Sequence, residues 1–343
     1  MEHTAATRTS NIELLRIILI LMVLTLHYFN ADIGGLFAHV TTGSANYYIA
    51  HFWESVCIIA VNVFIVITGY FSCYKKEISL SKPLYLYSLL VFYGAIFSAV
   101  ALYVKKPEIN FLLFKQLINA VSYRWFVVFY CILYILIPFL NKLVHSLNRA
   151  QLRQLLLINA LLFYAGSTFF PWHTITDYGY GIVNFVNLYL VGAYLRLYRP
   201  VALPKKRSFC IYLGCTLLTT AYSFVAGRAW YYSTIFNLVG AVAVFEFFRS
   251  IRLSYSPTIN KLAGYTFGVY IIHCSGIFTG KFFFQYLFSE HLFYNSPWMM
   301  LHCIGTVLGL YIVCIAIEWV RRLLLGWLWD RQIEKLPYKI RCE

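Results

Sequence analysis

Residues 11–27 read NIELLRIILILMVLTLH, an apolar run that contains one arginine, Arg16, and ends in a histidine, His27. A helix of about 20 apolar residues crosses the hydrocarbon core of a bilayer, and the apolar residues after this run make it long enough. Arg16 and His27 are eleven positions apart, or about three helical turns. Both side chains therefore lie on one face of the helix, separated by a rise of roughly 16 Å.

The composition extends this interpretation to the whole chain of 343 residues. Apolar residues make up 61% of it and charged residues 12%, whereas ordinary globular proteins have roughly 25% charged residues. So few charges cannot cover the surface of a soluble protein, which excludes a set of soluble domains. The sequence predicts an all-α, polytopic membrane protein.

Ten segments are apolar enough to cross the bilayer as helices. The loops between them are too short for a separate soluble domain, so residues 1–343 are predicted to form one membrane domain. The ten segments are 12–30, 47–71, 84–104, 123–143, 152–170, 180–198, 208–227, 231–249, 262–288 and 298–325.

The net charge of +15 would fit a nucleic-acid-binding protein, but its distribution does not. The Lys and Arg residues gather in short clusters between the apolar runs, and most of them fall on the side that holds both termini. Positive charge marks the cytoplasmic side, so both termini are predicted to be cytoplasmic and no nucleic acid is expected as a partner. Most of the nine cysteines lie inside apolar runs, where Cys is usually a packing residue, so neither disulfides nor a metal site are predicted.

Polar side chains inside the predicted spans are candidates for function, because burying them in lipid costs free energy. For most of them the sequence also offers a structural role. Asn62 suits hydrogen bonding between helices, His273 a satisfied core position and Trp125 the aromatic belt at the interface. Ion pairs between residues three or four positions apart on one helix would account for the two glutamates, Glu246 with Arg249 and Glu318 with Arg321 and Arg322.

Four stretches resemble the acyltransferase-3 family of integral membrane enzymes. The first is residues 11–27, with its Arg, ten intervening residues and His. The second is residues 62–71, NVFIVITGYF, which is similar to a Phe-rich stretch that closes with Ser-Gly-Phe or Ser-Gly-Tyr. The others are residues 125–141, with Trp-Phe followed by YILIPFLN, and residues 265–273, YTFGVYIIH. The matches follow the expected order over most of the chain.

The resemblance implies an enzyme of the bacterial cytoplasmic membrane that acylates a hydroxyl of an extracytoplasmic glycan. The implied partners are an acyl-CoA, with acetyl-CoA expected as co-substrate and no permanently bound cofactor, and a surface polysaccharide or lipid-linked glycan. Two departures stand out. Thr68 replaces the usual Ser, and an Arg-rich cluster after the second helix is reduced to Lys75, Lys76 and Lys82, which leaves open which of these lysines has its role.

These residues allow a mechanism. Arg16, helped by Lys82, would hold the donor phosphates at the cytoplasmic mouth, and the pantetheine arm would lie along the first helix. His27 would act as general base or carry the acyl group covalently. Glu54 is the candidate that orients His27, although a local bond to His51 or Ser55, or a position in a hydrated protein interior, would also explain it.

Asn62, Trp125 and His273 are tentative contributors to the acceptor site or the cavity lining. A transporter or flippase for lipid-linked sugars is the alternative function, because many spans with buried polar residues also fit that class. Such transporters are often built from two related halves, and no two-half pattern is found in the sequence.

Overall fold

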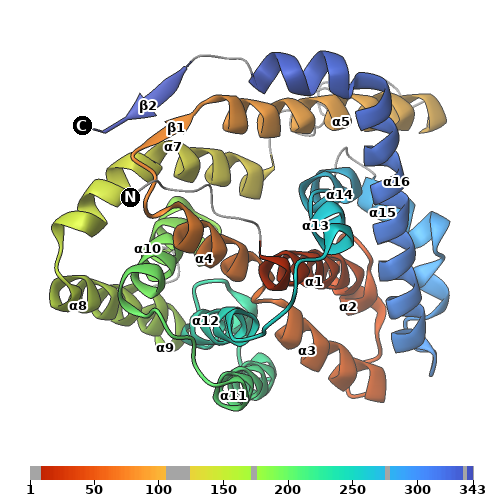
Figure 1. Cartoon of the computed structure of the whole chain (residues 1–343). Coiled ribbons are helices and arrows are strands. Elements are labelled where there is room, and N and C mark those ends of the chain that lie inside the picture. Colours follow the sequence, from red (N-terminus) through yellow and green to blue (C-terminus); the bar gives the residue numbers. More distant parts are fainter. Residues whose placement is uncertain (1–8, 106–123, 171–175, 275–278, 335–337, 343) are drawn as a thin grey trace.

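The computed structural model describes residues 9–105, 124–170, 176–274, 279–334 and 338–342. They form a bundle of helices in which α1 and α4 lie near the centre (Figure 1). The chain is thus an all-α polytopic membrane protein, as predicted.

The elements follow one another along the chain in short, mostly helical pieces. The α-helices are α1 (Ser10–Phe29), α2 (Leu36–His39), α3 (Ala45–Cys57), α4 (Ala60–Ser72), α5 (Ser81–Lys105), α7 (Trp125–Ser146), α8 (Arg149–Asn159), α9 (Gly166–Phe169), α10 (Ile182–Tyr198), α11 (Lys205–Ser223), α12 (Ile235–Arg249), α13 (Pro257–Ala263), α14 (Thr266–Cys274), α15 (Thr279–Lys281) and α16 (Met299–Glu334). The π and 3₁₀ turns are η1 (Ala160–Ala165), η3 (Asp177–Gly179), η4 (Gly227–Trp230), η5 (Phe282–Leu287) and η6 (Glu290–Leu292), and the strands are β1 (Glu77–Ser79) and β2 (Lys339–Arg341).

All ten predicted spans coincide with helical segments. Seven of these segments are long and apolar enough to cross a membrane within the described residues. Helix α10 is apolar but shorter than these seven segments. Helix α11 is long enough but not sufficiently apolar. The predicted span 262–288 is divided into α14, α15 and η5, and its residues 275–278 lie outside the described part of the chain.

Helix α1 is the element around which the others pack. It contacts α3, α4, α12, α13, α14 and α16. Its side chains Leu15, Leu19, Ile20 and Leu24 are fully buried, because neighbouring helices cover them. Its polar residues Glu13 and Arg16 line a cavity.

Helices α4 and α10 pack closely because each has a glycine at the crossing. A Cβ atom on Gly69 would collide with the carbonyl oxygen of Tyr189, and one on Gly192 would collide with that of Val66. Small residues allow helix backbones to approach in this way within membranes. The glycine of the TGY sequence at 68–70 thus has a packing role.

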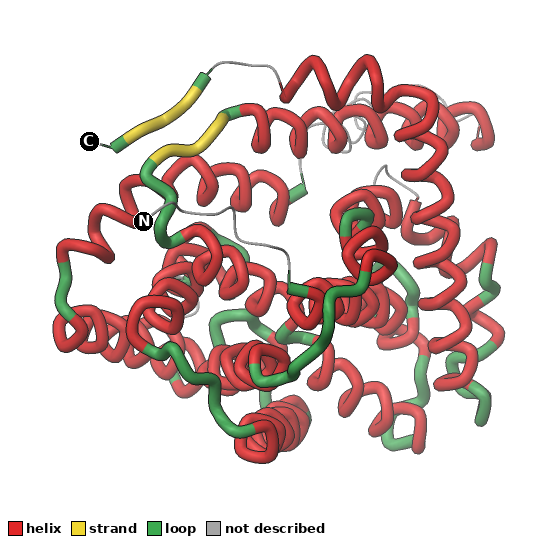
Figure 2. Tube along the Cα trace, viewed as in Figure 1, coloured by secondary structure: helices red, strands yellow, loops and turns green. Residues whose placement is uncertain are grey.

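The two strands lie at the edge of the bundle (Figure 2). β1 and β2 pair antiparallel, with Ile78 opposite Ile340, and Glu77 bonds Lys339 and Arg341 at 2.6 Å each. Lys75, just before β1, lines the same cavity as Thr9. The two ends of the described chain therefore lie on one side of the bundle. That this side is cytoplasmic stays a prediction. Two of the basic residues on which the prediction rests, Arg8 and Lys335, lie outside the described residues.

Replacing Gly192 with alanine is expected to destabilise the protein by about 1–3 kcal/mol, because the added methyl group overpacks the α4–α10 crossing. The melting temperature of the purified protein in detergent measures the effect. Gly214 in α11 is the matched control, since a Cβ atom there would meet nothing within 4 Å. Gly214→Ala should leave stability unchanged or raise it, and an equal loss in both variants would contradict the packing role.

Candidate active site

A cavity of about 680 Å³ runs beside α1. Thr9, Glu13, Arg16, Ile20 and Val23 form its α1 wall. Steps of three and four residues place all five on one face of the helix. His27, four residues after Val23, is the next position on that face, although it is not among the residues that line the cavity.

One end of the cavity is basic. Arg16, Lys75 and Lys82 line it, and the only acidic residue among the lining side chains is Glu13, whose Oε1 lies 3.6 Å from Nε of Arg16. Nε of Arg16 is buried and has no hydrogen-bond partner among the described residues. The structure thus brings together Arg16 and Lys82, which the sequence placed at one donor site.

Lys75 joins this basic end, whereas Lys76 is not among the lining residues. Burial lowers the pKa of Lys75, and the nearby charge of Lys82 lowers it further. The Nζ atoms of Lys75 and Lys82 lie 5.6 and 4.8 Å from the centre of the Tyr134 ring. Two ammonium groups and a guanidinium this close together favour an anion with several oxygens, such as a phosphate.

The middle of the cavity is apolar. Ile20, Val23, Val61, Phe64 and Phe126 line it. This part offers an extended chain a path from the basic end toward His27, with few polar groups to hydrogen-bond.

His27 is hydrogen-bonded to His273 of α14. Nδ1 of His27 lies 2.8 Å from Nε2 of His273, and Nδ1 of His273 lies 2.8 Å from the carbonyl oxygen of Val269. A carbonyl only accepts, so in a neutral ring Nδ1 of His273 carries the proton and Nε2 is an acceptor. His27 must then donate from Nδ1, which leaves its own Nε2 unprotonated and able to accept a proton.

His273 also forms a link to the cavity. Its side chain is fully buried, and its ring packs edge-on against Tyr270, with 5.9 Å between the ring centres. Tyr270 lines the cavity. His273 is therefore a satisfied core residue, one of its two predicted roles, and at the same time the direct partner of His27.

No hydrogen bond joins Glu54 to His27 among the described residues; Nδ1 of His27 is bonded to His273 instead. Thr25 lies beside Cys57 of α3, and residues two apart on a helix point about 200° apart. His27 consequently lies on the opposite face of α1 from the side that meets Cys57. Oε2 of Glu54 is buried without a hydrogen-bond partner among the described residues, and the tyrosines Tyr180 and Tyr232 lie in its neighbourhood.

Asn62 and Trp125 hold the aromatic region beside Glu54, and neither lines the cavity. Nδ2 of Asn62 donates to the carbonyl oxygen of Tyr232 at 2.9 Å, and its Oδ1 accepts from Asn184 at 3.3 Å. Trp125 packs edge-on against Tyr180, with 4.6 Å between the ring centres. Asn62 thus makes the contacts between helices that were one of its predicted roles.

The two other acidic residues of the spans form the predicted helix pairs. Glu246 lies 3.1 Å from Arg249. Glu318 is fully buried and bonds Arg321 at 2.8 Å and Arg322 at 2.7 Å. Arg322 also donates to the carbonyl oxygen of Gly264 at 2.7 Å. Because Gly264 lines the cavity, this ion cluster braces one cavity wall.

Sequence reasoning missed Tyr130 as a lining residue. Its hydroxyl accepts a hydrogen bond from Thr68 at 3.4 Å, and both residues line the basic half of the cavity. Phe126, Tyr130 and Tyr134 recur every four residues, which is a helical stripe that the sequence displays. The signal was hidden because the chain has 29 tyrosines and most of them serve packing.

The turn after His27 closes this end of the site. The amide of Gly34 donates to the carbonyl oxygen of His27 at 3.0 Å, and the carbonyl oxygen of Gly34 accepts from Tyr294 at 2.8 Å. Glu290 lies beneath this turn, fully buried, with both carboxyl oxygens unbonded among the described residues. Burial raises the pKa of Glu290 to about 9.

Comparison with known proteins identifies one family. A family model described as an acyltransferase domain matches residues 9–319. No curated protein and no solved structure matches the chain. The matched range contains the cavity, the histidine pair and every candidate site residue named above.

Replacing Glu290 with glutamine should stabilise the protein increasingly as the pH rises from 5 to 9. Folded Glu290 keeps its proton up to about pH 9, whereas an unfolded glutamate loses it near its ordinary pKa. Stability of the wild type therefore falls with rising pH through this window, and the neutral amide removes that loss. The measurement is the melting temperature of both proteins across this range.

The control for this experiment is Glu77→Gln. Hydrogen bonds from Lys339 and then Arg341 lower the pKa of the exposed Glu77, so its contribution is lost only as the pH falls through that lowered value. The Glu77→Gln difference should stay constant between pH 5 and 9. A constant difference for Glu290→Gln as well would contradict the raised pKa.

Proposed function

We propose, since the chain belongs to the acyltransferase-3 family, that it moves an acyl group from a cytoplasmic acyl-CoA to a hydroxyl of an extracytoplasmic glycan. The acyl group is acetyl in the proposal, and the enzyme works in the bacterial cytoplasmic membrane. One observation carries the proposal. A cavity that is basic at one end and apolar in the middle leads along α1 toward a histidine with an unprotonated Nε2.

The donor is proposed to enter at the basic end. Arg16, Lys75 and Lys82 would bind its phosphate oxygens, and a guanidinium can bind two oxygens at once. The apolar middle would take the pantetheine arm. The rise of roughly 16 Å from Arg16 to His27 lets an extended arm present its thioester in the outer half of the membrane without the whole donor crossing.

The reaction needs one base and one acid, and His27 can serve as both. Nε2 of His27 takes the proton of the acceptor hydroxyl, whose oxygen attacks the thioester carbonyl carbon. The carbon–sulfur bond breaks, and the leaving thiolate takes the proton from His27, which restores the neutral ring. His273 accepts the Nδ1 hydrogen bond throughout, so it holds the ring in this tautomer and stabilises the imidazolium that forms transiently.

His27→Ala is expected to abolish acyl transfer while the protein stays folded and inserted, because no other group supplies the base. His273→Ala should reduce kcat by about 10²–10⁴-fold, the range of general-base catalysis. His273→Gln should recover part of this loss, since its amide oxygen can still accept from Nδ1 of His27. Proton NMR of surface polysaccharide from cells carrying each variant measures the acetyl signals, and purified protein gives kcat and the pH profile.

Three results would count against this assignment. Full activity of His27→Ala would remove the proposed base. Loss of the polymer itself, instead of its acetyl groups, in cells without the gene would favour export of lipid-linked sugars. Equal activity of His273→Ala and His273→Gln would show that accepting the hydrogen bond is not what His273 contributes.

Arg16→Ala should raise the KM for acetyl-CoA by about 10–100-fold with a smaller effect on kcat, since a hydrogen bond to a charged group contributes about 1.5–3 kcal/mol. The matched control is Arg207→Ala, because Arg207 is an exposed basic residue of α11 that does not line the cavity. An unchanged donor dependence in Arg16→Ala would remove Arg16 from the donor site.

A further inference from the structure

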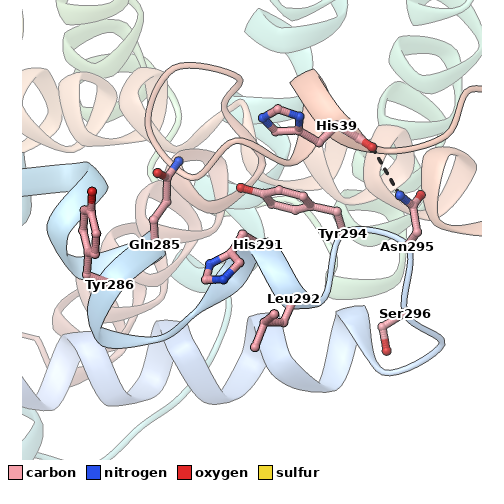
Figure 3. A pocket seen from close by; sticks show the side chains of 8 residues that line it. All are labelled: His39, Gln285, Tyr286, His291, Leu292, Tyr294, Asn295 and Ser296. Carbon is pink, nitrogen blue, oxygen red and sulfur yellow. Dashed lines mark hydrogen bonds between the residues drawn. The ribbon is translucent and has the colours of Figure 1, made fainter.

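A second cavity, of about 760 Å³, opens at the other end of α1. Two segments far apart in the sequence build it, as Figure 3 shows: His39 comes from α2, and the other lining side chains come from residues 285–296. The segment that contains α2 follows directly after α1. The cavity therefore lies beyond the end of α1 that carries His27, opposite the basic end of the donor cavity.

The lining of this second cavity combines polar groups with apolar surface, and it has no charged side chains apart from its histidines. It consists of His39, Gln285, Tyr286, His291, Leu292, Tyr294, Asn295 and Ser296, with no Lys, Arg, Asp or Glu. A phosphate or carboxylate would lack a fixed counter-charge here, and a lipid tail would leave the polar groups without partners. A neutral ligand with many hydroxyls fits best.

The cavity is preformed by hydrogen bonds between its two segments. Asn295 accepts from the amide of Thr41 at 2.8 Å and donates to the carbonyl oxygen of His39 at 3.2 Å; the second bond is dashed in Figure 3. Asn46 donates to the carbonyl oxygen of Ser296 at 2.8 Å. A site fixed in this way loses little conformational entropy when a ligand binds.

Several polar groups of the lining have no partner among the described residues and are exposed. They are the ring nitrogens of His39 and His291 and the hydroxyl of Tyr286, which is 69% exposed. The ring of Tyr294 stacks on that of His39, with 5.1 Å between the ring centres. Tyr286 adds an exposed aromatic ring to these groups. Sugars are recognised by this combination, because hydroxyls need hydrogen-bond partners and the C–H face of the sugar ring packs on an aromatic ring.

The cavity is also connected to the catalytic end of α1. Tyr294 and Gln285 donate to the carbonyl oxygen of Gly34 at 2.8 and 3.2 Å, and the amide of Gly34 donates to the carbonyl oxygen of His27. One turn of backbone thus separates this cavity from His27.

We propose that this cavity is a docking subsite for uncharged sugar units of the acceptor glycan that neighbour the unit to be acylated. This rests on the proposed function, because the donor cavity and His27 define where the acceptor must arrive. Tyr286 and His291 would contact the glycan and determine which polymer is accepted, without touching the reacting atoms.

The test compares Tyr286→Ala and His291→Ala with Tyr255→Ala in the full-length protein. Tyr255 is a matched control, because it is 70% exposed and belongs to neither cavity. The probe is surface polysaccharide of the host cell from which acetyl groups have been removed by mild alkali. Saturation-transfer NMR measures its binding, and acetyl transfer from acetyl-CoA gives the KM for each substrate.

The expected result is weaker binding and a KM for the polysaccharide at least tenfold higher in Tyr286→Ala and His291→Ala. Their KM for acetyl-CoA should not change, and Tyr255→Ala should match the wild type. His27→Ala should still bind the polysaccharide although it transfers nothing.

Two outcomes would overturn the subsite, and they separate it from the proposed function. If Tyr286→Ala and His291→Ala bind and acylate the polysaccharide as the wild type does, the subsite is wrong and the function stands. If the wild type neither binds nor acylates the polysaccharide, both proposals fall together. Melting temperatures equal to the wild type verify that the variants are folded.

Discussion

The hydrogen bond from His27 to His273 is the interaction on which the candidate site depends. It joins α1, the helix around which the bundle packs, to α14, whose Tyr270 lines the cavity. Because Val269 fixes the proton on Nδ1 of His273, the bond has one direction, and it leaves the basic nitrogen of His27 unprotonated. Without this partner the ring of His27 would be free to adopt either tautomer.

The order of charged, apolar and neutral polar side chains along α1 follows from the change in polarity across the bilayer. Cations are tolerated where water or lipid headgroups are near, apolar side chains dominate in the middle, and neutral polar groups return at the far end. Arg16, Ile20 and Val23, and then His27, follow this order on one helix face. The cavity lined by Arg16 and the second cavity lie toward opposite ends of the same helix, and His27 lies between them.

The sequence predicts where the helices lie along the chain better than it predicts how each helix is rotated about its axis. Length and apolarity located all ten helical segments, and one helix face was enough to pair Arg16 with a cavity. Glu54 was the candidate predicted to orient His27. Its failure to reach His27 depends on which neighbour each face of α1 meets, and Thr25 beside Cys57 turns His27 toward α14. Such contacts join residues far apart in sequence, and no local pattern encodes them.

The same limit explains why His273 looked ambiguous. A satisfied core histidine and a functional one are usually treated as alternatives, but here the first condition produces the second. The carbonyl oxygen of Val269 satisfies one nitrogen of His273, and that bond makes the other nitrogen an acceptor. A histidine exposed to water would exchange tautomers and titrate near its ordinary pKa. Burial at full hydrogen-bonding capacity is therefore what suits His273 to hold a second histidine in one protonation state.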